Sequence, residues 1–91
     1  MHLQAKLRLK KLIRELSNDE RLELAAQCGT SINYIRKVLS SDAIDFGPEL
    51  CEALEKNTGA LVLREELRDD WRKQWPDLAA RRDAQLILKP H

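Results

Sequence analysis

The sequence RLELAAQCGTSINYIRKVLS, residues 21–40, decides the fold that we expect for this chain. Apolar residues recur with helical spacing before Gly29, and a second such series begins just after it. A glycine at the end of a helix readily takes a positive φ and turns the backbone. Ser31 has the residue type and the place of a cap for the second helix, so the pattern is typical of a helix-turn-helix. We expect the inward-facing residues to be Leu22, Leu24, Ala25 and Cys28 in the first helix, and Ile32, Ile35, Val38 and Leu39 in the second.

The polar face of the second helix indicates what the motif could do. A helix fits the major groove of B-DNA, where asparagine can pair with adenine and arginine or lysine with guanine. Two short helices that meet at a glycine also occur in plain helical bundles, in which the same residues only face solvent. We expect contacts with bases, nearby phosphates or the DNA backbone from Gln27, Ser31, Asn33, Tyr34, Arg36, Lys37 and Ser40.

The composition favours a single all-α domain. The chain has 91 residues, of which 43% are hydrophobic, with only three glycines and three prolines. No long alternating run predicts a strand, no apolar stretch reaches membrane-spanning length and no signal-peptide pattern is seen, so we expect a cytoplasmic protein.

The residues that carry chemistry in other proteins are sparse in this chain. Cys28 and Cys51 lie inside helical patterns, without a CxxC motif or matching histidines, which favours buried free thiols. No catalytic set of side chains and no phosphate-cradling glycine loop is visible. We therefore expect no metal, no cofactor and no enzymatic activity.

The charges are unevenly distributed, although the net charge is only +1. Residues 1–14 carry five bases and no acid, whereas residues 42–70 carry nine acids and three bases. Such a separation lets one surface attract phosphate while another stays acidic. The bases near the start could also be an ordinary solvated face; among them we expect phosphate contacts from Lys6, Lys10 and Arg14.

Further helices are expected on both sides of the motif. A helix over residues 3–16 precedes it, and Ser17 to Glu20 reads as a capping box, S-x-x-E, that starts the next helix. After a polar loop, Pro48 begins a fourth helix that ends near Gly59. The first helix would turn inward Leu3, Leu7, Leu9, Leu12, Ile13 and Leu16, and the loop would fold Ile44 and Phe46 onto the core.

A fifth and last core helix is expected over residues 64–71, after a short extended stretch. Trp71 and Trp75 lie one helical turn apart, a spacing that favours packing against the core over ligand binding. Pro76 would end this element. Asp77 could then cap a short helix in the remaining extension.

The succession AAQCGTSINYIRKVL, PELCEALEKNTG, REELRDDW and WPDL resembles the Cro/YdaS-like family of phage repressors and prophage regulators. The likeness covers about residues 3–78, and its most specific part is G-x-L-V-x-R-E-E-L-R at residues 59–68. Members of the family usually carry Thr or Ser before R-E-E-L as a helix cap, where this chain has Leu63. The resemblance implies a compact five-helix helix-turn-helix domain over residues 1–76 and a regulator of transcription that binds double-stranded DNA.

The function that we predict is a sequence-specific repressor of phage or prophage type. We expect a homodimer that binds an operator, because one short helix reads too few base pairs to be specific in a genome. The alternative is an antitoxin or another interaction module, whose tail binds a toxin or a different regulator. The extension over residues 77–91 motivates this alternative. Chain ends are often disordered, but we expect self-association or docking on a partner from Leu86, Ile87 and Leu88.

Overall fold

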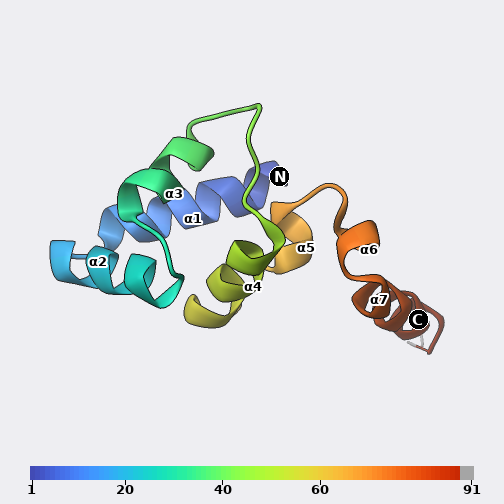
Figure 1. Cartoon of the computed structure of the whole chain (residues 1–91). Helices are drawn as coiled ribbons and strands as arrows, with labels where there is room; N and C mark the ends of the chain where they lie inside the picture. The colour runs from blue at the N-terminus through green and yellow to red at the C-terminus, as the bar shows by residue number, and fades with distance from the viewer. Residues whose placement is uncertain (89–91) are drawn as a thin grey trace.

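The structure is a computed structural model that describes the backbone of residues 1–88 and the side chains of residues 1–86. These residues form seven helices and no strand (Figure 1). The all-α prediction is confirmed, whereas the expected number of five helices is wrong. The helices are α1 Leu3–Glu15, α2 Asn18–Gln27, α3 Ile32–Leu39, α4 Pro48–Asn57, α5 Arg64–Leu67, α6 Trp71–Gln74 and α7 Pro76–Leu88.

The first five helices and the segments between them share one hydrophobic core. α1 passes behind α3, α2 lies across one end of this pair, and α4 and α5 cover the remaining side (Figure 1). Each fully buried large apolar side chain contributes about 1.5–3 kcal/mol relative to its exposed state. The core consists of Ala5, Leu9, Ile13, Ala25, Ile35, Val38, Leu39, Phe46, Cys51, Leu54, Val62 and Leu67.

The turn between α2 and α3 agrees with the sequence prediction. Gly29 follows α2 with φ +71°, and the Thr30 amide donates to the Ala25 carbonyl at 2.9 Å. This bond satisfies a carbonyl that the end of the helix would leave unpaired. Ser31 then accepts a hydrogen bond from the Tyr34 amide at 3.1 Å and so caps the start of α3.

Two other predicted helix starts are confirmed. In the capping box the Glu20 amide donates to Ser17 Oγ at 3.2 Å, and the Ser17 amide donates to Glu20 Oε1 at 2.9 Å. Pro48 occupies the first turn of α4, where its missing N–H has no consequence for hydrogen bonding. Both signals lie within a few residues of the helix that they start.

The inward face that we predicted for α1 is partly wrong. Leu3 is 63% exposed and Leu7 is 49% exposed, whereas Ala5 is fully buried. The six apolar residues expected inside cover more than half of the circumference of the helix, so they cannot all face one core. The core contacts the narrower stripe of Ala5, Leu9 and Ile13, which recur every four residues.

Two further residues expected in the core are exposed. Leu22 is 61% exposed because it lies two residues from the buried Leu24, on nearly the opposite side of α2. In the α3–α4 loop Phe46 is fully buried as predicted, but Ile44 is 41% exposed. Phe46 therefore closes this part of the core, and Ile44 remains outside it.

The single helix predicted over residues 64–71 is wrong, because Arg68 is extended (φ −140°, ψ 133°) and separates α5 from α6. Arg68 Nη1 donates to the carbonyl of Phe46 at 2.8 Å, and its Nε donates to Asp70 Oδ1 at 2.7 Å. The side chain thus ties the break to the loop before α4. At the start of α5, the Leu63 amide donates to Glu66 Oε1 at 3.0 Å, and the Glu66 amide, which a Thr or Ser cap would bind, donates to the Leu63 carbonyl at 2.9 Å.

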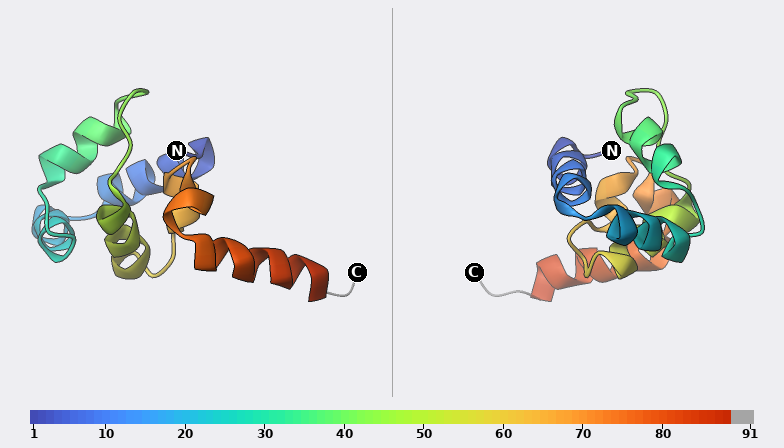
Figure 2. Two further views of the ribbon diagram at one scale, coloured as in Figure 1. Left: turned by 45° about the vertical axis from the view of Figure 1, so that its right-hand side comes forward. Right: turned by 90° about the vertical axis from the view of Figure 1, so that its left-hand side faces the viewer.

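The extension is a long helix that leaves the domain. Pro76, predicted only to end a helix, ends α6 and also opens α7, where a first-turn proline is tolerated. α7 projects from one end of the molecule (Figure 2). Leu78 and Ala79 in its first half are each only 8% exposed, whereas Leu86 is 71% exposed. The boundary predicted at residues 76–77 falls at the start of this helix.

The two tryptophans lie at the two ends of α6, since Trp71 is its first residue and Trp75 follows its last. Trp75 packs against the core as predicted, and the Arg64 guanidinium lies 5.9 Å from the centre of its ring. Trp71 is half-buried, with the Arg72 guanidinium 4.7 Å from its ring centre. Such cation–aromatic contacts are worth about 0.5–1 kcal/mol at exposed sites.

Candidate nucleic-acid interface

Helix α3 is fixed by one face and presents the other to solvent. Ile35 and Val38 are fully buried, because α1 and α2 pack on this side of the helix. Asn33, Arg36 and Lys37 are exposed on the opposite side. Short and long polar side chains are therefore displayed from a rigid support.

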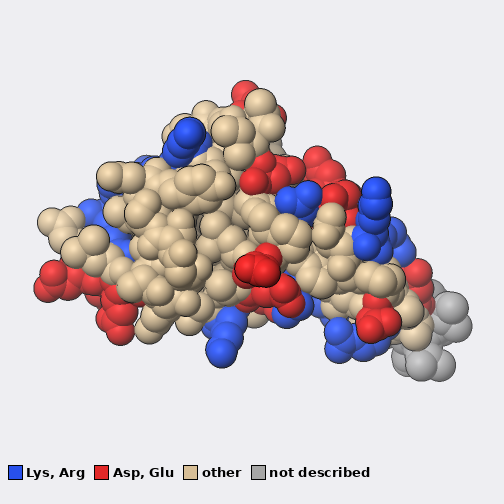
Figure 3. Space-filling view, viewed as in Figure 1, with Lys and Arg blue, Asp and Glu red and all other residues tan. Residues whose placement is uncertain are grey.

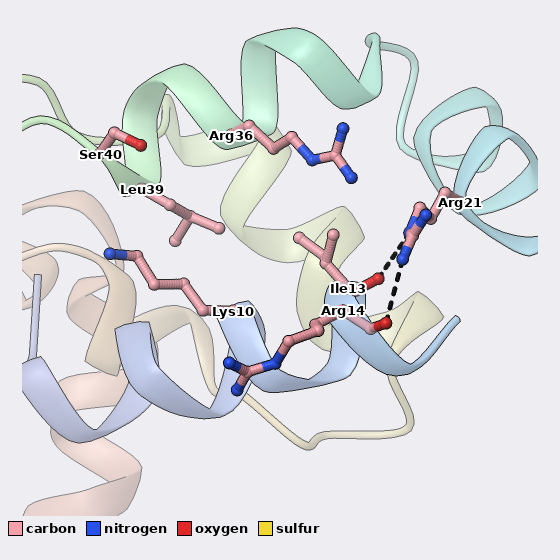
Figure 4. Close-up of a pocket in the computed structure, with 7 residues that line it drawn as sticks. All are labelled: Lys10, Ile13, Arg14, Arg21, Arg36, Leu39 and Ser40. Carbon is pink, nitrogen blue, oxygen red and sulfur yellow. Dashed lines mark hydrogen bonds between the residues drawn. The ribbon is translucent and has the colours of Figure 1, made fainter. Parts of the chain in front are cut away.

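A basic hollow lies beside α3 and extends its polar face onto two other helices. Its volume is about 320 Å³, and four cationic side chains line it. Ile13 and Leu39 form an apolar floor between α1 and α3, and Ser40 lies at one end (Figure 4). No acidic residue lines it. The cations, from α1, α2 and α3, are Lys10, Arg14, Arg21 and Arg36.

Arg21 holds α1 and α2 together at this hollow. Its Nε donates to the Ile13 carbonyl at 2.7 Å, and its Nη2 donates to the Arg14 carbonyl at 3.0 Å (Figure 4). Its Nη1 donates to Asn18 Oδ1 at 3.0 Å. The two carbonyls belong to the last turn of α1, which has no further helical amides to pair with them. Arg21 is not among the residues predicted from the sequence, although its place just after a capping box, near the end of the preceding helix, is a usable signal.

Of the predicted phosphate contacts, the structure brings Lys10 and Arg14 to the hollow but not Lys6. Lys6 Nζ donates to the Ser41 carbonyl at 3.2 Å and lies 3.5 Å from Asp42 Oδ1. Its side chain is only 15% exposed. Lys6 therefore joins α1 to the α3–α4 loop.

The predicted base-reading residues occupy three different surroundings. Arg36 and Ser40 line the basic hollow, while Asn33 and Lys37 stand on the open face of α3. Tyr34 is 40% exposed at the start of the helix. Ser31 uses its hydroxyl oxygen as the cap of α3, although the hydroxyl hydrogen can still be donated.

Gln27 does not join this group. It lines a separate hollow of about 370 Å³ whose rim carries the carboxylates of Glu20 and Glu23. The Gln27 amide nitrogen donates to Glu23 Oε1 at 3.4 Å. The structure thus places Gln27 next to acids on α2, away from the cations beside α3.

Charged side chains are unevenly distributed over the surface. In Figure 3 the surface over α3 is mostly uncharged, with Lys and Arg side chains at its edges; Asp and Glu side chains cover the far end of α2, and both signs are mixed over α4 to α7. Acids of α4 and α5 are neutralised locally: Arg64 pairs with Glu52 and Glu55 at 2.9 Å each, and the two glutamates of α5 also pair with arginines. The cations around α3 are consequently the more available for an anionic partner.

The tail residues are only partly placed by the structure. Leu86 lies on the exposed part of α7, on the same side of the helix as Leu78 and Ala79. The side chains of Ile87 and Leu88, which we also expect to contact a partner, lie outside the described residues. Arg82 of the same helix is held by Glu65, with Nη2 to Oε1 at 2.6 Å.

Both cysteines are free thiols, and Cys51 is buried as predicted, whereas Cys28 is only half-buried. Burial raises the pKa of the Cys51 thiol to about 12, and burial likewise raises the pKa of Cys28. Both therefore stay protonated and unreactive at neutral pH. Among the described residues, no three His, Cys, Asp or Glu side chains are grouped as a metal site would require. None of the described helices combines the length and the apolar character that crossing a bilayer requires.

Comparisons with protein-family models, with curated proteins and with solved structures find no match for this chain.

Proposed function

We propose that this chain is a sequence-specific, double-stranded DNA-binding regulator of transcription, a repressor of phage or prophage type. The observation that carries the proposal is the arrangement of α3. Its back face is buried through Ile35 and Val38, while Asn33, Arg36 and Lys37 face solvent. An α-helix fits the major groove, and these three residue types pair with adenine, guanine or phosphate there.

The surroundings of α3 support the same proposal. The positive φ of Gly29 and the Ser31 cap place a tight turn between α2 and α3, which is the kind of connection that a helix-turn-helix uses. The basic hollow continues the cationic surface onto α1, and no acid lines it. DNA binding depends strongly on phosphate contacts of this kind, which give affinity without sequence selection.

The proposal includes a homodimer because α3 is short. Helix α3 has eight residues, and one such helix contacts only a few base pairs. Two copies that read half-sites about one turn of DNA apart, near 34–36 Å, would supply the missing specificity. The exposed end of α7 is the surface that we assign to this contact, since Leu86 is 71% exposed.

The test is selection from a random pool of duplex oligonucleotides at near-physiological salt, with sequencing of the bound fraction. We expect a motif with two related half-sites. A single enriched half-site would keep sequence reading but contradict the dimer. No enrichment by a protein whose circular dichroism shows it to be folded would contradict the function itself.

A second candidate function is favoured by α7 alone. The helix leaves the domain and carries an exposed leucine at its far end (Figure 2). An antitoxin or another interaction module would use such a helix to bind a toxin or a different regulator. In that case a chain without the end of α7 keeps its own oligomeric state and its DNA affinity, and loses only the partner.

A further inference from the structure

The arginines of this chain fall into two groups. Within the described residues, most arginines form an ion pair with a carboxylate, and Arg14, Arg21, Arg36 and Arg81 form none. Three of these four line the basic hollow. The arginines with a carboxylate partner are Arg8, Arg64, Arg68, Arg72 and Arg82.

Cations gathered without a counter-ion favour a bound anion. Lys10, Arg14 and Arg36 are exposed, and none of their side chains has a hydrogen-bond partner among residues 1–88. Ile13 and Leu39 beneath them are 4% and 2% exposed, so water is absent on that side and the attraction for an anion is less screened. An anion is therefore attracted more strongly to these cations in the hollow than it would be on an open surface.

The size and the polar groups of the hollow fit a phosphate group. A water molecule takes about 30 Å³ in the liquid. The 320 Å³ of the hollow therefore have room for one phosphate group and several of its waters. Arg36 can offer two parallel N–H groups, Lys10 a compact positive charge, and Ser40 a hydroxyl donor. In Figure 4 the Arg36 guanidinium points toward Arg21 and the Lys10 ammonium toward the Ser40 end of the hollow, and Arg14 lies at the outer rim, turned away from Arg36. Arg36 and Lys10 are exposed side chains, so a bound phosphate has to draw their charged ends together.

Arg21 has a different part in this arrangement. Three of its nitrogens donate to Ile13, Arg14 and Asn18 at 2.7–3.0 Å, so few of its donors remain for a ligand. These bonds fix the end of α1, which carries Lys10 and Arg14, against α2. Arg21 thereby sets how far the cations of α1 lie from Arg36.

We propose that the hollow is a binding site for one phosphate group, with Lys10 and Arg36 as its direct ligands and Arg21 as the positioning residue. The phosphate can come from the backbone of a DNA duplex or from a free phosphate-bearing molecule. Binding of a DNA phosphate rests on the proposed function, whereas the phosphate site itself does not.

The site is tested with inorganic phosphate and the full chain, by following backbone amide and arginine side-chain NMR signals at constant ionic strength. We expect saturable shifts at Lys10, Arg36 and Ser40 in the millimolar range. Lys10→Gln and Arg36→Gln should each weaken binding about tenfold, because a charge-assisted hydrogen bond is lost. The matched controls are Lys11→Gln and Arg81→Gln, which remove the same charges outside the hollow and should leave binding unchanged. Shifts that do not saturate, or equal losses in the controls, would overturn the site.

The positioning role has a test of its own. Arg21→Lys keeps the charge but cannot reach three oxygens at once, so phosphate binding should weaken several-fold. Asn18→Ala removes one of the three acceptors and should weaken binding less, with the fold retained. If both variants, folded by circular dichroism, bind phosphate like the parent chain, Arg21 does not position the site.

Duplex DNA separates this inference from the proposed function. If the phosphate comes from DNA, inorganic phosphate competes with the duplex, and Lys10→Gln reduces the slope of log affinity against log salt by about 1 on every sequence. Phosphate binding without any duplex binding would support the site with a free phosphate-bearing ligand and would contradict the proposed function. Duplex binding that Lys10→Gln and Arg36→Gln affect no more than the controls would overturn the site alone.

Discussion

Asn33 is the residue on which sequence reading depends most directly in the proposed complex. It lies at the centre of the open face of α3, opposite the buried Ile35 and Val38. An asparagine amide can form two hydrogen bonds with adenine, and no other base presents that pattern in the major groove. The same side chain has no hydrogen-bond partner among the described residues, so its replacement leaves the fold intact.

Asn33→Ala should therefore cost about 1–3 kcal/mol of binding to the selected operator and relax the preference at one base pair. The measurement is a set of binding isotherms on the operator and on its single-base-pair variants. Gln4→Ala, an exposed amide on α1, is the control and should change nothing. Equal losses on the operator and on scrambled DNA would contradict a base contact by Asn33.

Ala60 is a second residue that makes a sharp prediction, because it has φ +64° without being glycine. A left-handed backbone costs a residue with a Cβ about 1–2 kcal/mol. Ala60→Gly removes this strain but makes the unfolded chain more flexible, so the net gain in the free energy of unfolding should be about 0.5–1 kcal/mol. Urea denaturation measures it.

Gly29→Ala is the converse experiment. Gly29 has φ +71°, and no heavy atom lies within 4 Å of an added Cβ, so backbone strain is the only expected effect. The free energy of unfolding should fall by about 0.5–1 kcal/mol. If Ala60→Gly and Gly29→Ala change the free energy of unfolding in the same direction, φ does not control stability at these two turns.

At the scale of elements, α5 is the clearest case of a helix that its neighbours hold in place. Four residues are far too few for a stable isolated helix. Each charged residue of α5 is bound to another element: Arg64 to α4, Glu65 to Arg82 of α7, and Glu66 to Arg8 of α1. The apolar Leu67 is fully buried.

The Glu66 pair makes the stability of this region depend on pH. Burial alone would raise the pKa of Glu66, but the hydrogen bonds from Arg8 and from the Leu63 amide, with the charge of Arg8, lower it below 4.5. A carboxyl whose pKa is lower in the folded state adds stability above its unfolded pKa and loses that contribution as the pH falls. The contribution is thus present at neutral pH and absent in strong acid.

Glu66→Gln should lower the free energy of unfolding by about 1 kcal/mol at pH 7, since the pair is partly exposed, and by less near pH 3. Urea denaturation at both pH values measures the difference. Glu23→Gln is the control, because Glu23 is exposed in the middle of α2 and forms no ion pair among the described residues. A deficit that stays the same at both pH values would mean that the charge of Glu66 is irrelevant.

At the scale of the whole molecule, the projecting helix α7 is the feature that a compact domain does not explain. The described chain measures 44 × 26 × 21 Å. α7 is held by the pairs Arg82–Glu65 and Arg72–Asp83, and by the buried Leu78 and Ala79. These contacts all lie before residue 84, so the end of the helix can be removed without disturbing them.

A chain that stops after Asp83 should become a monomer by light scattering, with a melting temperature independent of concentration. Its affinity for a two-half-site operator should fall by about 10²-fold, because the second half-site is no longer bound from the same complex. If mass and affinity are unchanged, the tail serves a different partner, as the second candidate function requires.

The sequence by itself determined the features whose causes lie within one turn of a helix. The Ser17–Glu20 capping box, the turn at Gly29, the Ser31 cap and the start of α4 at Pro48 all join residues at most five positions apart. The buried stripe of α3 follows from its spacing alone. Local hydrogen bonds and local spacing can be read from the order of residues, because they need no knowledge of distant neighbours.

Only the tertiary structure decided the features that join residues distant in the sequence. Arg68 breaks the predicted fifth helix through the carbonyl of Phe46, 22 residues away, and Lys6 is directed to Asp42, 36 residues away. The basic hollow exists because Arg36 packs beside α1, which a charge pattern along the chain cannot show. Which face of α1 is buried was likewise set by where α3 and α5 lie against it. Burial and ion pairing depend on distances in space, and folding fixes those distances.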